Sequence, residues 1–214
     1  MPSVCVVASA HLQEGTSGVD RRQFLEAIAG ISSMVPALAL LPAGDPGAFA
    51  ATMHARAQAA GALRTLSPAQ DALLDAIAEM LLPQTDTVGA RAVGVNRFID
   101  LLLTESMLEA DRERFLAGLA AIDARSQSLH GSAFVAARRS DQEALIGALD
   151  AQLPAKPLTT AERAALERQP VTAETGYATL KQMVVFAYFT SEPVAKGLIH
   201  SPIIPGRYDG CAHT

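Results

Sequence analysis

The sequence predicts an all-α protein: a small helical domain with an irregular, extended C-terminal tail, preceded by an N-terminal signal segment. Three observations predict this class. Apolar residues recur at spacings of three and four through the middle of the chain, as on helices with one buried face. Ser-Pro-Ala-Gln at 67–70 combines an N-cap, a proline at the first helical position and a capping-box glutamine. The one run that could alternatively form a buried strand has no evident pairing strand elsewhere in the chain.

Residues 1–50 resemble a twin-arginine export signal, the address read by the bacterial machine that moves folded proteins. A polar stretch ends in two arginines, and Phe and Leu follow closely. The residues that carry this pattern are Arg21, Arg22, Phe24 and Leu25. The uncharged apolar run 27–41 follows, and its 15 residues fall short of the roughly 20 that span a bilayer.

Ala48 and Ala50 form a small-x-small cleavage pattern, so we expect the mature chain to start at Ala51. The alternative is an ordinary apolar helix behind a chance pair of arginines. A leader that stays uncleaved and tethers the protein to the membrane is a further possibility.

The alanine-rich residues 51–65 lack a strong apolar period and are expected to form a linker or a loose helix. Residues 66–200 make up the predicted helical domain. Its first helix starts after Ser67, with Gln70 as capping-box partner, and ends before Pro83 because the residue before proline avoids helical geometry. The apolar stripe of this helix consists of Leu73, Leu74, Ile77, Met80 and Leu81.

A loop at 83–94 follows, with short turn elements of its own. Two more helical stripes come next. One contains Val95, Phe98, Ile99, Leu102 and Leu103, and the other contains Leu108, Phe115, Leu116, Leu119 and Ile122. Ser140 to Glu143 predicts a second capping box ahead of another helix. Residues 153–160 then form a linker with two prolines.

Residues 177–190 are predicted to be a helix, although their Val-Val-Phe run also fits a buried strand. The helix is favoured because Leu180, Met183, Val184 and Ala187 share one face. The last segment, 201–214, contains two prolines and two glycines and is therefore predicted to be an irregular tail.

The charge of the chain argues against a nucleic-acid partner. The formal net charge is −5, and removing residues 1–50 takes away two of the 17 Lys and Arg and four of the 22 Asp and Glu, which leaves about −3. No basic patch remains to hold phosphates. Cys5 lies in the leader and Cys211 stays alone, so no internal disulfide is expected. Cys211 is either a spare thiol or half of an intermolecular bridge.

No catalytic, cofactor-binding or metal-binding residue is predicted in this chain. His54, His130, His200 and His213 do not lie at helical spacing from one another. The glycine-rich nucleotide motifs and the Cys-x-x-Cys-His haem motif are missing from the sequence. Pairs of carboxylates four residues apart on amphipathic helices more often form a solvated face than an acid–base pair.

Two regions are predicted to contact a partner. The loop after the first helix is unusually detailed, and Asp86 between threonines suits either a rigid corner or a docking ledge. The end of the chain is rich in Tyr, Phe and Arg, types enriched at interface anchors, unless the tail folds over its own core. The candidate interface residues are Asp86, Tyr188, Phe189, Pro205, Arg207, Tyr208 and Cys211.

The stretches LPQTDTVGARAVGVNRFID and YFTSE…IPGRYDGC resemble the gluconate 2-dehydrogenase subunit 3 family, over residues 65–211. The resemblance implies a non-catalytic small subunit that has no cofactor of its own. It implies a large partner subunit of the glucose-methanol-choline type, which carries FAD and oxidises a sugar, glycoside or sugar acid. In such complexes a cytochrome c subunit with haem often accepts the electrons.

The resemblance also implies an escort role, in which the catalytic subunit leaves the cytoplasm attached to the small subunit. The expected location is the periplasm, with membrane association through the complex. The alternative is a free-standing periplasmic enzyme or ligand-binding protein that uses His200, Arg207, Tyr208 and Cys211.

Overall fold

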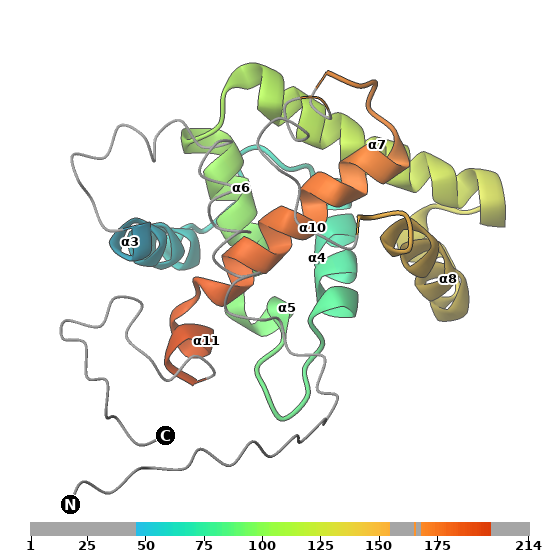
Figure 1. The fold of residues 1–214 in the computed structure, drawn as a ribbon. Coiled ribbons are helices and arrows are strands. Elements are labelled where there is room, and N and C mark those ends of the chain that lie inside the picture. Colours follow the sequence, from blue (N-terminus) through green and yellow to red (C-terminus); the bar gives the residue numbers. More distant parts are fainter. Residues whose placement is uncertain (1–45, 155–164, 166–167, 198–214) are drawn as a thin grey trace, which may run out of the picture.

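The computed structural model describes residues 46–154, 165 and 168–197, and all regular elements in this part of the chain are helices (Figure 1). The predicted all-α class is therefore confirmed for these residues, while the signal segment and the tail lie outside them. The helices are α3 (Pro46–Ala59), α4 (Pro68–Leu81), α5 (Ala90–Val93), α6 (Val95–Glu105), α7 (Glu109–His130), the 3-10 helix η1 (Phe134–Ala136), α8 (Arg139–Asp150), α10 (Ala173–Phe189) and α11 (Glu192–Gly197). No helix in this part is long and apolar enough to cross a bilayer.

Helix α10 lies at the centre of the molecule, with α7, α6, α4 and α8 packed around it (Figure 1). Its buried face includes Leu180, Met183, Val184 and Ala187, the four residues that the sequence places together. The helix prediction for this segment is confirmed, and the strand alternative is wrong. The helix begins at Ala173, four residues earlier than predicted.

The early start of α10 has a local cause, a capping box that the sequence analysis did not identify. Thr175 N–H donates to the Thr172 hydroxyl at 3.3 Å, and Thr172 N–H donates to the Thr175 hydroxyl at 2.9 Å. These two bonds satisfy amides that have no partner within the helix. A threonine at the third position thus replaces the Glu or Gln of the usual pattern.

Among the described helices, α10 and α7 share the most extensive interface, and two glycines allow their backbones to come close together. A Cβ atom added to Gly118 of α7 would lie 2.8 Å from the Cα of Gly176 in α10, and one added to Gly176 would lie 2.6 Å from the Cα of Gly118. Real Cβ atoms do not approach so closely. The two backbones therefore touch at a point where neither helix tolerates a side chain.

The predicted start of α4 is confirmed. Gln70 N–H donates to Ser67 Oγ at 3.3 Å, and Ser67 N–H donates to Gln70 Oε1 at 2.9 Å, with Pro68 as the first helical residue. The predicted stripe also faces the core, since Leu73, Leu74 and Ile77 are buried.

The second predicted capping box, at Ser140–Glu143, is wrong. Helix α8 begins at Arg139, two residues earlier than a cap at Ser140 predicts, and its N-cap is Arg138, whose side chain makes no capping hydrogen bond. Both acids of the expected motif instead pair with arginines on the surface. Arg138 Nε lies 3.0 Å from Asp141, and Arg139 Nε lies 2.6 Å from Glu143. Ser140 therefore lies inside the first turn.

Of the two expectations for residues 51–65, a linker or a loose helix, the structure shows a helix: α3 runs from Pro46 to Ala59 and packs against α6. Ala50, Met53 and Ala57 are buried in the core. These positions lie on one face, at spacings of three and four. The stripe was not evident in the sequence because alanines occupy both sides of the helix, so the buried face is hardly more apolar than the exposed one.

Candidate partner interface

The loop between α4 and α5 is exposed to solvent, yet hydrogen bonds between its own residues hold its two ends together. We name residues 82–89 the corner. Ala90 N–H donates to the Leu82 carbonyl at 2.9 Å, which brings the ends together. The side chain of Gln84 spans the inside: its Oε1 accepts from Gly89 N–H at 2.8 Å, and its Nε2 donates to the Thr87 carbonyl at 3.1 Å. The corner is therefore a defined shape on the surface.

Helix α4 fixes both sides of the corner through one carboxylate. Glu79 Oε1 accepts from Gln84 N–H at 3.0 Å, and Oε2 accepts from Arg91 N–H at 3.0 Å. The Arg91 side chain returns to α4 as an ion pair with Asp75 at 2.7 Å. The corner thus keeps its orientation relative to α4.

The tip of the corner carries the predicted residue Asp86. Thr85 N–H donates to the Thr87 carbonyl at 3.1 Å, and the Thr85 hydroxyl donates to Asp86 Oδ1 at 3.0 Å. Asp86 itself is exposed. The rigid-corner interpretation therefore agrees with the bonding, and the exposed tip leaves room for the docking-ledge interpretation as well.

Two positions of the corner region are occupied by glycine because a side chain there would clash or strain the backbone. A Cβ atom on Gly89 would lie 2.7 Å from Gln84 N. Gly94, between α5 and α6, has φ of 71°, the left-handed region that glycine adopts without strain. Its Cβ would also lie 2.6 Å from the amide nitrogen of Gln58, which donates to the Val93 carbonyl at 3.0 Å.

Tyr188 of α10 connects the helix core to the corner. Its hydroxyl donates to the Val88 carbonyl at 2.6 Å, and its ring packs edge-on against Phe189 with centroids 5.2 Å apart. The Tyr188 side chain is 4% exposed and Phe189 is half-buried. The structure thus brings two predicted interface regions together. It places Tyr188 inside the molecule, where its ring and hydroxyl support the corner.

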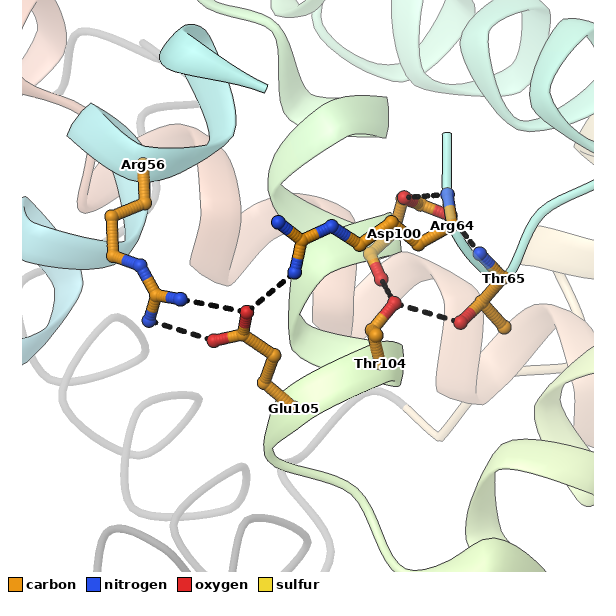
Figure 2. Close-up of polar contacts among 6 residues, drawn as sticks. All are labelled: Arg56, Arg64, Thr65, Asp100, Thr104 and Glu105. Atoms are coloured by element: carbon orange, nitrogen blue, oxygen red, sulfur yellow. Dashed lines mark hydrogen bonds and ion pairs between the residues drawn. The ribbon is translucent and has the colours of Figure 1, made fainter. Parts of the chain in front are cut away.

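Asp100 has a structural role that the sequence did not reveal. It is 4% exposed on α6, and its carboxylate holds the segment before α4 (Figure 2). Oδ2 accepts from Arg64 N–H at 2.8 Å, and Oδ1 accepts from Thr65 N–H at 2.9 Å and from Leu66 N–H at 2.7 Å. An acid inside the apolar run Phe98–Leu103 is the signal for such a residue, because a buried charge requires partners.

Glu105, one turn further along α6, bridges two arginines (Figure 2). Its two oxygens each lie 2.7 Å from a guanidinium nitrogen of Arg56 in α3, and Oε1 lies 2.8 Å from Arg64 Nη1. The paired contact with Arg56 has the fork geometry of strong arginine–carboxylate pairs. Because both arginines are about half exposed, the bridge fixes the direction of α3 more than it adds stability.

A pocket of about 280 Å³ lies between the end of α3, residues 60–64 and α6. Two of its polar lining residues already have partners in the chain: Asp100 as described, and Asn96, which donates to Asp71 at 2.7 Å. The pocket is open, and its chemistry specifies no particular ligand.

His54 of α3 is buried against α6 and α10. Its ring stacks on Phe98 with centroids 4.1 Å apart, and Nε2 lies 3.2 Å from the Thr190 hydroxyl. Burial lowers the pKa of His54 to about 4. The imidazole is therefore neutral near pH 7 and acts as a packing residue.

A further cluster of polar side chains joins α8 to α10. Tyr177 donates to Asp150 Oδ1 at 2.9 Å, and Lys181 pairs with the same oxygen. Burial tends to raise the pKa of Asp150, but the bonds from Lys181 and Tyr177 outweigh it and lower the pKa. Burial raises the pKa of Tyr177, and the bond to Asp150 adds to that effect. Among the described residues, no group of three or more His, Cys, Asp or Glu has a metal-binding arrangement.

The remaining predicted residues divide into two groups. Ala48 and Ala50, the expected cleavage pattern, both lie in α3, where Ala48 is exposed and Ala50 is buried. The others lie outside the described residues: Arg21, Arg22, Phe24, Leu25, His200, Pro205, Arg207, Tyr208 and Cys211.

Comparison with known proteins assigns the chain to a family. The family model for gluconate 2-dehydrogenase subunit 3 matches residues 68–206. Neither the curated proteins nor the solved structures gave a match. The matched range starts at the first residue of α4 and includes the corner, Asp100 and α10. It covers more than half of the chain, and the chain therefore belongs to the gluconate 2-dehydrogenase subunit 3 family.

Proposed function

We propose that this chain is the non-catalytic small subunit of an exported, FAD-dependent dehydrogenase of the glucose-methanol-choline type. The catalytic partner oxidises a sugar, glycoside or sugar acid. The small subunit escorts it through the twin-arginine route and stabilises it. Family membership over residues 68–206 is the observation that carries the proposal, because the family is defined by a subunit of a multi-subunit enzyme.

The export part of the proposal rests on the paired Arg21 and Arg22 before an apolar run. Because the twin-arginine route moves folded proteins, one signal serves two assembled subunits. The complex then lies in the periplasm and reaches the membrane through its assembly, with FAD in the large subunit and haem in a cytochrome c subunit where one is present.

The corner supports the proposal as a docking surface. Its tip is exposed, while its backbone donates hydrogen bonds to the side chains of Glu79 and Gln84 and accepts one from the Tyr188 hydroxyl. A surface that is ordered before binding loses little conformational freedom when a partner docks. The corner therefore has the properties of an interface that binds without rearrangement.

The first test is a pull-down of the full chain, tagged at its C-terminus, from periplasm and membranes of cells that produce both subunits. We expect a stoichiometric larger protein with flavin absorbance and sugar dehydrogenase activity. The matched control replaces Arg21 and Arg22 by lysines, which should leave both proteins together in the cytoplasm. A colourless chain without a partner would contradict the proposal, and a bound cofactor in that chain would favour the free-standing alternative.

The second test addresses the corner. Asp86→Arg reverses an exposed charge at the tip and is expected to reduce the yield of co-purified flavoprotein at least several-fold, with an unchanged melting temperature. Glu113→Arg makes the same change on the exposed surface of α7 and should leave the yield unchanged. Equal yields for the two variants would remove the corner from the interface.

A further inference from the structure

The predicted cleavage site lies inside a folded helix. Ala48, Phe49 and Ala50 are the third to fifth residues of α3, and the expected cut between Ala50 and Ala51 falls within that helix. Ala48 is exposed, Phe49 is half-buried against the core and Ala50 has no exposed surface. In addition, the Thr52 hydroxyl donates to the Ala48 carbonyl at 2.8 Å.

Proteases bind their substrates as extended strands, and cleavage of folded proteins concentrates at exposed loops. A signal peptidase must accommodate the side chains at Ala48 and Ala50 in one extended segment. In α3 the two residues lie two positions apart, so they point to different sides of the helix, and one of them is buried. Cleavage therefore requires unwinding at least the first turns of α3.

The rest of α3 resists that unwinding because it is attached along its length. Met53 is 3% exposed and Ala57 is 1% exposed. His54 stacks on Phe98, Arg56 pairs with Glu105, and Gln58 donates to the Val93 carbonyl. These contacts join α3 to α6 and to the end of the corner region. Helix α3 is thus part of the folded domain, although it precedes the range that the family model matches.

We propose that the exported protein keeps α3 whole. Processing after Ala50 does not occur on the folded chain, and the cut falls before Pro46 or the leader is retained. The inference rests on the proposed twin-arginine export, since only a folded cargo presents α3 to the peptidase already docked. It replaces the cleavage site that the sequence pattern suggests.

The test uses the folded full chain and a purified bacterial signal peptidase in detergent, with intact-mass analysis of the products. The expected result is no product that starts at Ala51. A product with that N-terminus, formed at the rate of an unstructured leader peptide, would overturn the inference. Ala48→Lys is the matched variant, because it blocks a small-residue subsite at an exposed position. We expect it to give the same products as the wild type, and loss of a product would also contradict the inference.

Export itself is measured separately, by fractionating cells and determining the N-terminus of the periplasmic chain. A chain that starts at or before Pro46 supports the inference, and a start at Ala51 overturns it. A chain that stays in the cytoplasm contradicts the export proposal, whereas the peptidase assay still decides whether folded α3 is cut. The two failures are therefore distinguishable.

Discussion

Asp100 accepts hydrogen bonds from three backbone amides of the segment before α4. Asp100→Asn keeps the shape but places an amide donor against N–H donors. We expect it to lower the free energy of unfolding by roughly 2–4 kcal/mol, since unsatisfied buried donors are costly. Urea unfolding measures the loss. The exposed Asp86→Asn should stay within about 0.5 kcal/mol of wild type, and similar losses in both variants would show that the amides find other partners.

His54 makes stability depend on pH. Its pKa is about 4 in the folded chain and about 6.5 when unfolded, so the unfolded state takes up the proton first as pH falls. Stability should therefore decrease from pH 6.5 to pH 4, with no further contribution from His54 below that range. His54→Gln should show a shallower decrease over the same window in thermal melts at several pH values. Parallel curves for the two proteins would contradict this assignment.

At the scale of elements, the crossing of α7 and α10 depends on two glycines. Gly118→Ala and Gly176→Ala each force a methyl group into the opposing backbone, and we expect each to cost about 2–3 kcal/mol. Gly147→Ala is the matched control, because nothing lies within 4 Å of its added Cβ on the exposed side of α8. It should stabilise the protein by about 0.5–1 kcal/mol. Destabilisation by all three changes would point to a general effect of the substitution.

Tyr188 links an element to the corner through a single bond. Tyr188→Phe removes the hydroxyl that donates to the Val88 carbonyl while keeping the buried ring. A loss of about 1 kcal/mol is expected, with faster amide exchange at Thr85 to Gly89 and little change in α7. Uniformly faster exchange throughout the protein would show that the bond supports the core rather than the corner.

At the scale of the whole molecule, one apolar cluster joins buried residues from α3 to α11. Unfolding should therefore be a single cooperative transition that includes α3. Every ion pair found among the described residues has a partly exposed member. The stability should thus change by less than about 1 kcal/mol between low and high salt. Two transitions followed by circular dichroism, with α3 melting first, would contradict this description.

Much of the fold was predictable because its information is local. The stripe of α4, the capping box at Ser67 and the apolar face of α10 are each contained in one short segment. One prediction from a local capping motif was wrong. Ser140 had the right neighbours for a cap, but α8 begins at Arg139, two residues earlier than that cap predicts. For residues 51–65 the sequence left a linker and a loose helix open and did not indicate the buried face of α3, because alanine does not mark which side of a helix is buried.

The candidate site was predictable only in outline. The residue types of the loop indicated the corner. That Gln84 and Glu79 hold it by hydrogen bonds depends on how the chain folds back on itself. Tyr188 was predicted as part of a separate region, the aromatic end of the chain, and its contact with the corner depends on Val88, 100 residues away in the chain. Asp100 was not identified from the sequence: it is a charge in an apolar run, but its partners lie 34 to 36 residues earlier.

The sequence by itself determined the all-α class, the main helices and the family, because periodicity, caps and motifs are properties of neighbouring residues. Tertiary structure alone decided that Gly118 meets Gly176, that Asp100 holds the segment before α4 and that α3 belongs to the core. The physical reason is the same in each case. Burial, close backbone contact and the partners of a buried charge depend on which distant segments meet, and that is fixed only when the helices pack.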